Sequence, residues 1–481
     1  MNTITRPEVL DVLTKYFYPI LKKTEDIESF TRTVSCEMRK LSADVLTRAI
    51  EAFDAEIRAS VPFAWKVKDR PPRTVITLLG QIRYSRTLFI DEYGRARYLT
   101  DEILGISKRS RFSDDAFLWI VNRAAYVSFR RTAQDFHELS DATISPVGVM
   151  KMVHKEGMIL KEYLLSERHG SDKICQDRLF VEADGVFVAL QSESKRKQAI
   201  ARHLYESSRY KHSVEIKCAL SYAGKTQAQE PTKKVRGNVL SVCTVGDKNE
   251  LFAMVAADIK HHYDASEVKV IISASDGAAC YRDHGLDDEF PQASFAHCLD
   301  PFHIVRALTA AFPNQTLRSK LLSMVFSSEI EGFSALCTYL EHIAETEAEQ
   351  LKIAECKRYI RNNAENIRPK ISLGTMEGTI SHIWAKRMKN NATSWSRKGA
   401  EAMALIRSFL CCKRDLIAPV KQVFFTEVEK ERKMGVVADA YRNRGYAQPE
   451  GSGYLPYQAS APLAKAPGRY LPGSFRHLRV R

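Results

Sequence analysis

The sequence predicts an α/β protein whose central part is a mixed sheet flanked by helices. Three strand-like runs follow one another, at residues 179–190, 213–224 and 235–246. The second and third end in glycine, which is typical of antiparallel strands joined by turns. A helical period then covers residues 247–263, with Asp247 as its N-cap, and an apolar run at 268–278 is typical of a fully buried strand. We therefore expect three antiparallel strands, a helix and a strand that returns to the sheet.

The first predicted strand, L-F-V-E-A-D-G-V-F-V-A-L, is mostly apolar but carries two carboxylates at its centre. Because side chains two residues apart point to the same face of a strand, Glu182 and Asp184 project together, beside Phe180 and Val186. Burying an unpaired carboxylate costs several kcal/mol of free energy, or the group takes up a proton. Such a residue therefore normally has a partner. A salt bridge on an edge strand and a cation site are the two interpretations of this pattern.

The order of elements is that of a ribonuclease H-like fold. In this fold one acidic residue lies in the middle of the first strand and a second lies at the C-terminal end of the fourth, side by side in the sheet. Asp184 and Asp276 occupy these two positions. A further short strand is expected at residues 293–299, followed by a helix at 300–312. The sequence thus predicts a ribonuclease H-like core in which two carboxylates meet.

Three modules are expected before this core. Residues 1–70 are helical with charged faces and end at the breaker D-R-P-P-R, and residues 71–112 form a small β unit with a break at Gly80. Residues 113–172 return to helix, with a short break at S-D-A-T. Two helices across a short turn are compatible with a DNA-binding helix-turn-helix and equally with simple packing. We expect these modules to bind DNA.

The core continues beyond the predicted fifth strand. We assign residues 173–312 to its first part, the helical and charged residues 313–370 to an all-helical insertion, and residues 371–415 to a C-terminal core helix region. The last segment, 416–481, is an extension. From residue 446 onward it is basic, rich in Pro and Gly and nearly free of acids, so we expect it to be disordered.

One helix of the C-terminal region carries a further acid. Thr375 is placed to cap this helix, and Glu377 lies in its first turn. The apolar stripe of the helix comprises Met376, Ile380, Ile383, Trp384 and Met388. Glu377 lies next to this stripe, where it either complements the helix dipole, as is common, or faces a site in the core.

Composition favours an anionic partner. The 481 residues include 72 Lys and Arg against 58 Asp and Glu, a formal net charge of +14, which favours binding to nucleic acid. No apolar run approaches the ~18 residues of a membrane helix, and the N-terminal sequence has no signal-peptide core, so we expect a cytoplasmic, nucleoid-associated protein. The ten cysteines are scattered and form no C-x-x-C pair, so we interpret them as reduced and mostly part of the core.

Four segments of the chain resemble a known family. They are V-E-A-D-G-V-F-V-A-L-Q, S-D-G-A-A-C-Y-R-D, L-D-P-F-H-I-V-R-A-L and T-M-E-G-T-I-S-H-I-W-A-K-R-M-K-N-N-A-T-S-W-S-R-K-G-A-E-A-M-A-L-I-R. Together they are similar to the ISLre-type insertion-sequence transposases, relatives of the Mutator-like DDE transposases. The resemblance extends from about residue 75 to about residue 410. Its most specific part is the block E-G-x-x-S-H with the later W-S-x-x-G-A.

This resemblance implies a bacterial DDE transposase, which cleaves DNA at the ends of an insertion sequence and joins the freed 3′-hydroxyls to target DNA. The implied catalytic and metal-binding triad is Asp184, Asp276 and Glu377, which would hold two magnesium or manganese ions. Hard divalent cations prefer carboxylate oxygens, and a pair of them is a standard means of cutting and joining phosphodiesters. The implied partners are double-stranded DNA, as element ends and as target, and further copies of the chain in a homo-oligomeric synaptic complex; no membrane is involved.

Two other functions stay open. A ribonuclease H-like nuclease or resolvase would hydrolyse DNA without strand transfer, and a domesticated DNA-binding protein would carry an inactive site. Among the weaker site candidates, Glu182 is expected to line the site, and Asp300 and His303 either position substrate or form a helix cap with a satisfied histidine. Trp384 and Trp395 are expected in the core rather than against bases.

Overall fold

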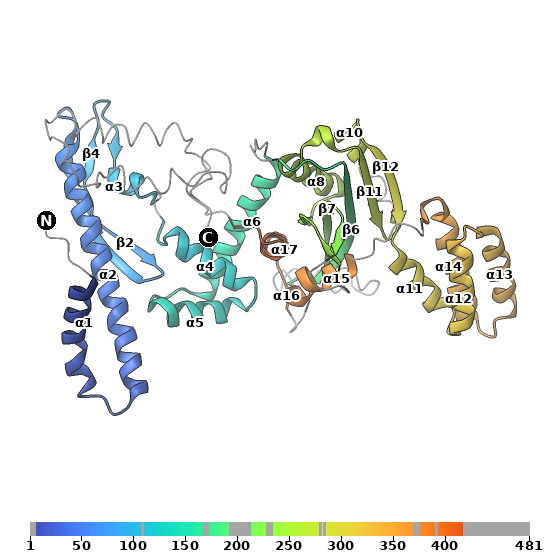
Figure 1. The fold of residues 1–481 in the computed structure, drawn as a ribbon, viewed down its shortest axis with the longest axis horizontal. Helices are drawn as coiled ribbons and strands as arrows, with labels where there is room; N and C mark the ends of the chain where they lie inside the picture. The colour runs from blue at the N-terminus through green and yellow to red at the C-terminus, as the bar shows by residue number, and fades with distance from the viewer. Residues whose placement is uncertain are drawn as a thin grey trace, which may run out of the picture. The chain divides into compact units, whose positions relative to one another are not determined.

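The structure of the chain is a computed structural model, and it describes residues 6–106, 110–166, 173–191, 213–227, 234–278, 281, 285–368, 376–389 and 393–416. These residues form a mixed α/β protein (Figure 1). They divide into two compact units, one with the described residues up to Met152 and one with those from Val153 to Leu416. The cap predicted at Thr375 and the tail predicted from residue 446 lie outside the described residues.

The first unit combines helices with small antiparallel sheets. Its helices are α1 (Arg6–Leu21), α2 (Ile27–Ser60), α3 (Leu99–Ile103), α4 (Asp114–Ala124), α5 (Phe129–Ser140) and the start of α6 (Pro146–Leu165). Its strands are β1 (Lys66–Asp69), β2 (Pro72–Thr77), β3 (Gly80–Ser85), β4 (Leu88–Ile90) and β5 (Ala96–Arg97). β2 pairs with β3, and β1 and β5 both pair with β4.

The predicted helices and strands of this part are confirmed, with two corrections. Residues 99–103, which the sequence places in the small β unit, form the helix α3. Residues 66–69, which the sequence places in a helical segment, form the strand β1. The reason is tertiary, because Lys66 and Val67 pair with Ile90 and Phe89 of β4. The predicted break at S-D-A-T separates α5 from α6.

The second unit is built on a five-stranded mixed sheet with the strand order β10-β7-β6-β11-β12. Its strands are β6 (Arg178–Ala189), β7 (Ser213–Tyr222), β10 (Leu240–Thr244), β11 (Val270–Ser275) and β12 (Ser294–Leu299). β6, β7 and β10 pair antiparallel, whereas β11 runs parallel to both β6 and β12. α8 (Lys248–His262) connects β10 to β11, and the carboxylate of Asp247 caps it by accepting a 2.9 Å hydrogen bond from the N–H of Glu250. The predicted order of strands and helix is therefore confirmed.

Two expectations about these strands are wrong. The run predicted as one strand at 235–246 is divided, because β9 (Lys234–Arg236) pairs with β8 (Lys225–Gln227) and β10 begins only at Leu240. Asn238 lies between them with a φ of 50°, a left-handed conformation that a strand does not accommodate. The interpretation of Glu182 and Asp184 as an edge-strand salt bridge fails as well, since β6 is the central strand of the sheet.

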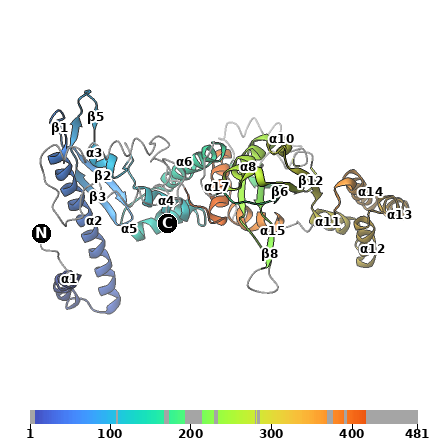
Figure 2. The ribbon, with the colours of Figure 1, turned by 45° about the horizontal axis from the view of Figure 1, so that its top comes forward.

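A helical segment follows the last strand, as predicted. Its elements are α11 (Pro301–Ala311), α12 (Gln315–Phe326), α13 (Ile330–Ile343), α14 (Glu347–Asn362) and the 3-10 helix η3 (Ala364–Asn366). Shorter elements, η2 (Ala265–Glu267) and α10 (Leu286–Glu289), precede and follow β11. The helical segment buries a core that includes Leu321, Phe333 and Ile360, and Leu299 at the end of β12 belongs to the same cluster. The insertion is therefore packed onto the end of the sheet (Figure 2).

The C-terminal helix region packs on the sheet. It consists of α15 (Met376–Ile380), the π-helical turn η4 (Ser381–Ala385), α16 (Lys386–Met388) and α17 (Arg397–Cys411). α15 and η4 contact β6, and α17 contacts β7 and β10. All five side chains of the predicted apolar stripe are buried, as is Trp395, which confirms their core placement.

Two further properties agree with the sequence. Among the cysteines that the structure describes, none is in a disulfide, and Cys218, Cys243, Cys298, Cys337 and Cys356 are buried. Within the described part of the chain, no helix is both long enough and apolar enough to cross a membrane.

α6 and α17 approach each other closely at a glycine. A Cβ added at Gly157 would lie 2.3 Å from the Cβ and 2.4 Å from the Cα of Ala402. These distances are far inside van der Waals contact, and the atoms that block the space belong to a short side chain and to backbone. Only glycine therefore permits this helix pair to support the sheet at its present spacing.

We predict that Gly157→Ala lowers the free energy of unfolding by about 1–3 kcal/mol, because the added methyl group must push α6 and α17 apart. Gly378→Ala in α15 is the matched control. Nothing lies within 4 Å of a Cβ at Gly378, so this variant should keep the wild-type stability or gain up to about 1 kcal/mol. Urea denaturation followed by circular dichroism measures both. A Gly157→Ala variant as stable as the wild type would contradict the close packing.

Candidate active site

The register of the sheet brings three carboxylates level with one another. β11 pairs Ala274 with Glu182 of β6 on one side and with Cys298 of β12 on the other. β11 ends at Ser275 and β12 at Leu299, so Asp276 and Asp300 directly follow their strands, two residues beyond the pairs of Ala274. The register thus brings both acids to the place in the sheet where Asp184 lies, two residues beyond Glu182 in β6.

Asp184 and Asp276 are each held by a local backbone hydrogen bond. Asp184 lies in the middle of β6, and its Oδ1 accepts a 2.7 Å bond from the N–H of Gly185. Asp276 follows the last residue of β11, and its Oδ1 accepts a 2.9 Å bond from the N–H of Ala278. The turn after Asp276 depends on Gly277, whose φ of 88° lies in the left-handed region that favours glycine. Both carboxylates are thus oriented by the chain immediately after them.

Asp300 and His303 form a helix cap that also reaches Asp184. The Oδ1 of Asp300 accepts a 3.0 Å hydrogen bond from the N–H of Phe302 at the start of α11. One turn later, the Nε2 of His303 lies 3.9 Å from Oδ2 of Asp184 and 4.0 Å from Oδ2 of Asp300. The cap expected from the sequence is confirmed. The histidine lies about equally far from the two carboxylates, and its role in positioning substrate stays a prediction.

Glu377 belongs to the same electrostatic cluster. It is exposed in the first turn of α15, the helix that packs against β6. Burial raises the pKa of Asp184 to about 6; the hydrogen bond from Gly185 and the proximity of His303 oppose this rise, and the charges of Asp276 and Glu377 add to it. Asp184 is therefore influenced by the charges of both other acids singled out in the sequence.

The acids are not gathered into a ready-made metal-binding group in the described part of the chain. Across the described ranges, no group of three or more His, Cys, Asp and Glu side chains is gathered tightly enough to hold a metal ion. The pKa of Asp300 is also raised, first by burial and then by the charges of Glu182 and Glu377, while the bond from Phe302 and the nearby His303 lower it. The site combines several carboxylates with too little compensating positive charge, which suits a divalent cation by the chemistry of its donor atoms.

Glu182 differs from Asp184 in its burial and in its hydrogen-bond partner. Its side chain is 1% exposed, and its Oε1 accepts a 2.6 Å hydrogen bond from the hydroxyl of Tyr222. The ring of Tyr222 in turn stacks on Phe180, with 5.4 Å between the centroids. As expected, Glu182 lies on the same face of the sheet as Asp184. Its carboxylate is held by the hydrogen bond from Tyr222. Its charge is one of the causes that raise the pKa of Asp300.

The helix that carries Glu377 is anchored through its π-helical turn. A π-helical turn leaves carbonyl groups without their regular helical partners, and such turns are frequent at functional sites. Arg407 of α17 is 5% exposed and donates to the carbonyl oxygens of Ile383 and His382, the latter at 2.7 Å. This buried guanidinium fixes the turn that directly follows α15.

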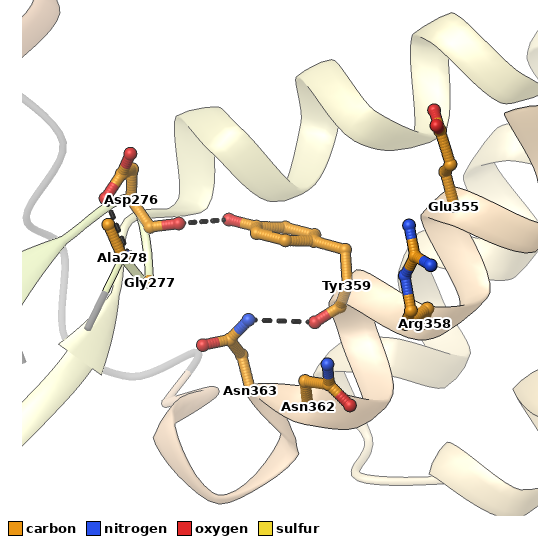
Figure 3. A pocket seen from close by; sticks show the side chains of 8 residues that line it. All are labelled: Asp276, Gly277, Ala278, Glu355, Arg358, Tyr359, Asn362 and Asn363. Atoms are coloured by element: carbon orange, nitrogen blue, oxygen red, sulfur yellow. Dashed lines mark hydrogen bonds between the residues drawn. The ribbon is translucent and has the colours of Figure 1, made fainter.

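Two residues of the helical insertion reach the site without any signal in the sequence. The hydroxyl of Tyr359 in α14 donates a 2.8 Å hydrogen bond to the carbonyl oxygen of Asp276. Asn363 follows the end of α14, and its side chain donates a 2.9 Å bond to the carbonyl of Tyr359 (Figure 3). No motif marks these residues, because they lie more than 80 positions from Asp276 and meet it only through the fold.

Residues 21–415 match UPF0236, which is described as an uncharacterised protein family. The chain belongs to UPF0236. One UPF0236 protein of Caldanaerobacter subterraneus subsp. tengcongensis is 27% identical over 436 residues, which cover 89% of this chain and 85% of that protein, and its name joins eleven locus designations. A UPF0236 protein of Streptococcus gallolyticus is 22% identical over 402 residues, which cover 80% of this chain and 83% of that protein.

One solved structure is similar to this UPF0236 chain over much of its length. It is the Drosophila P element transposase strand transfer complex, with a TM-score of 0.24 and 11% sequence identity, over 75% of this chain and 93% of that chain.

We predict that Asp184→Asn stabilises the metal-free protein at pH 8 but not at pH 4. A carboxyl whose pKa rises from 3.8 to about 6 on folding costs stability above pH 6 and nothing below about pH 4. Removing the charge should therefore recover about 1–3 kcal/mol at pH 8. Thermal unfolding in the presence of EDTA measures this, with Asp177→Asn as control, since Asp177 is exposed and lies just before the same strand. An equal effect of Asp184→Asn at both pH values would contradict the raised pKa.

Proposed function

We propose that this UPF0236 protein is a DDE transposase of a bacterial insertion sequence, with a ribonuclease H-like core. One observation carries the proposal. Asp184 lies in the central strand β6, beside the point where the parallel strand β11 ends and Asp276 follows, and Glu377 is carried by a helix that packs on β6. Such a triad on one face of a sheet is suited to phosphoryl transfer, in which charge develops on several oxygens at once.

The strand order supports a ribonuclease H-like interpretation of the core. Three antiparallel strands, a connecting helix and two parallel strands follow one another in the chain, and the first strand lies at the centre of the sheet. The two aspartates then fall in the middle of the first strand and after the fourth. The helices α12 to α14 intervene before Glu377, as the proposed insertion requires.

The carboxylates would hold magnesium or manganese, in a pair of ions, through Asp184, Asp276 and Glu377. Bound there, the ions would activate the attacking water or 3′-hydroxyl and stabilise the leaving oxygen. The protein's own part is to orient the acids through Gly185, Ala278 and the packed helix of Glu377. His303, between Asp184 and Asp300, is placed to orient Asp184 or to donate to a phosphate oxygen.

Two further facts support DNA as the substrate. The formal charge of +14 provides the excess of Lys and Arg that binding to a phosphate backbone needs. One relative carries a name that joins eleven locus designations, and a single protein encoded at many loci is what a self-copying element produces. We extend the proposal to element ends and target DNA as partners, to DNA contacts by the modules within residues 1–172, and to a homo-oligomer in the synaptic complex.

We predict that Asp184→Asn, Asp276→Asn and Glu377→Gln each slow DNA cleavage at least about a hundredfold while leaving DNA binding intact, because loss of a ligand removes several kcal/mol of transition-state stabilisation. The substrate is a duplex containing the DNA that flanks the gene, with Mg²⁺ or Mn²⁺, and the products are separated on a sequencing gel. Asp177→Asn and Glu345→Gln, both exposed acids outside the cluster, are the matched controls.

The products decide between the proposal and its alternatives. Joined products with a short target duplication support a transposase, whereas hydrolysis without joining indicates a nuclease or resolvase. DNA binding by the wild type without cleavage indicates an inactive, domesticated protein. A variant of the triad that cleaves at the wild-type rate removes that residue from the site.

A further inference from the structure

The helical insertion forms one wall of a pocket that opens beside Asp276. The pocket has a volume of about 510 Å³ and is lined by Asp276, Gly277, Ala278, Glu355, Arg358, Tyr359, Asn362 and Asn363. In Figure 3 the ring of Tyr359 extends from α14 toward the Asp276 turn, while Glu355 and Arg358 lie further along the same helix. A pocket of this size is in the range that accepts a small ligand or one unit of a polymer.

The contact between α14 and the Asp276 turn is specific and partly buried. Besides the hydrogen bond from Tyr359, the end of α14 approaches Gly277 so closely that an added Cβ would lie 2.6 Å from Oδ1 of Asn363 and 2.9 Å from Cδ1 of Leu299. Asn363 itself is 6% exposed. The turn that orients Asp276 is therefore held from two sides, by its own backbone and by the insertion.

The polar groups of the pocket suit a nucleotide. A guanidinium binds phosphate oxygens, carboxamides bind the edges of bases and sugars, and a tyrosine ring offers a flat face. Arg358 is exposed and forms no ion pair or hydrogen bond with the residues that the structure describes. Glu355 also lines the pocket, and its carboxylate would repel a phosphate, so the phosphate is expected on the side of Arg358 that faces away from Glu355.

We propose that α14 completes the active site: Tyr359 and Asn363 position the Asp276 turn, and Arg358 binds a phosphate of the DNA strand that passes Asp276. The inference rests on the proposed function, since it states along which helix the bound DNA strand continues beyond Asp276. Tyr359 is a positioning residue, because it acts on Asp276 through the backbone. Arg358 is a binding residue, because it would contact the DNA strand directly.

Tyr359→Phe tests the positioning role, because it removes one hydroxyl and keeps the ring. The Mn²⁺ concentration for half-maximal cleavage should rise about threefold to tenfold, as expected for one lost hydrogen bond, with the rate restored at saturating Mn²⁺. Tyr339→Phe, on the exposed face of α13 in the same insertion, should change nothing. A Tyr359→Phe variant with the wild-type Mn²⁺ dependence overturns the positioning role.

Arg358→Gln tests the phosphate contact. Its affinity for the flanking-DNA duplex should fall, and the slope of log Kd against log salt should decrease by about one, as for the loss of a single phosphate contact. Arg361→Gln is the control, since Arg361 is exposed on the same helix but does not line the pocket. An unchanged slope for Arg358→Gln, or an equal change for both variants, overturns the contact.

Both readouts remain informative if the proposed function fails. Should the wild type cleave no DNA, the rise in melting temperature with Mn²⁺ replaces cleavage as the measure of Tyr359→Phe, and the binding assay for Arg358→Gln is unaffected. An unaltered response of Tyr359→Phe in that titration overturns the positioning role in the same way. Failure of catalysis and failure of the α14 contact are thus separate results.

Discussion

The parallel register of β6 and β11 is the constraint on which the candidate site depends. It places a carboxylate in the middle of the central strand directly beside one that follows the neighbouring strand, Asp184 and Asp276. Two like charges on a largely buried face repel each other and lose hydration, and burial is the main reason that the pKa of Asp184 is raised to about 6. The other elements of the second unit hold the two acids in position in spite of this repulsion and loss of hydration.

The supporting elements come from distant parts of the chain. Arg407 fixes the π-helical turn behind Glu377, and the close contact of Gly157 with Ala402 brings α6 against α17. On the other side, Tyr359 holds the backbone of Asp276 from the helical insertion. Each of these supports acts on backbone or on helix position, so none of them uses a carboxylate oxygen of Asp184, Asp276 or Glu377.

The neighbours of the acids show why a sheet interior is a suitable place for such chemistry. Glu182 lies on the same face as Asp184 but is satisfied by Tyr222, whereas Asp184 accepts only the bond from Gly185 among the hydrogen bonds of its side chain in the described chain. His303 lies about equally far from Asp184 and Asp300. Asp184 is thus the less fully paired of the two acids, which is why the proposed function assigns a cation to Asp184 and not to Glu182.

Most strands of the second unit and their order along the chain could be predicted from local patterns, because period-two alternation, apolar runs and glycine ends are properties of short segments. The apolar stripe beside Glu377 was equally readable, and its five residues are buried. Some elements were predicted wrongly. β1 is a strand and not a helix because it pairs with β4. β10 begins later than predicted because Asn238 before it has a left-handed conformation.

Only the tertiary structure decided which groups surround the acids. The central position of β6, the pairing of Glu182 with Tyr222 and the contact of Tyr359 with Asp276 all join residues that lie far apart in the chain. No local pattern encodes such contacts, since they result from the packing of whole elements against one another. The sequence could name acids suited to one site, whereas the fold decided how far each is buried, and burial sets the pKa of Asp184.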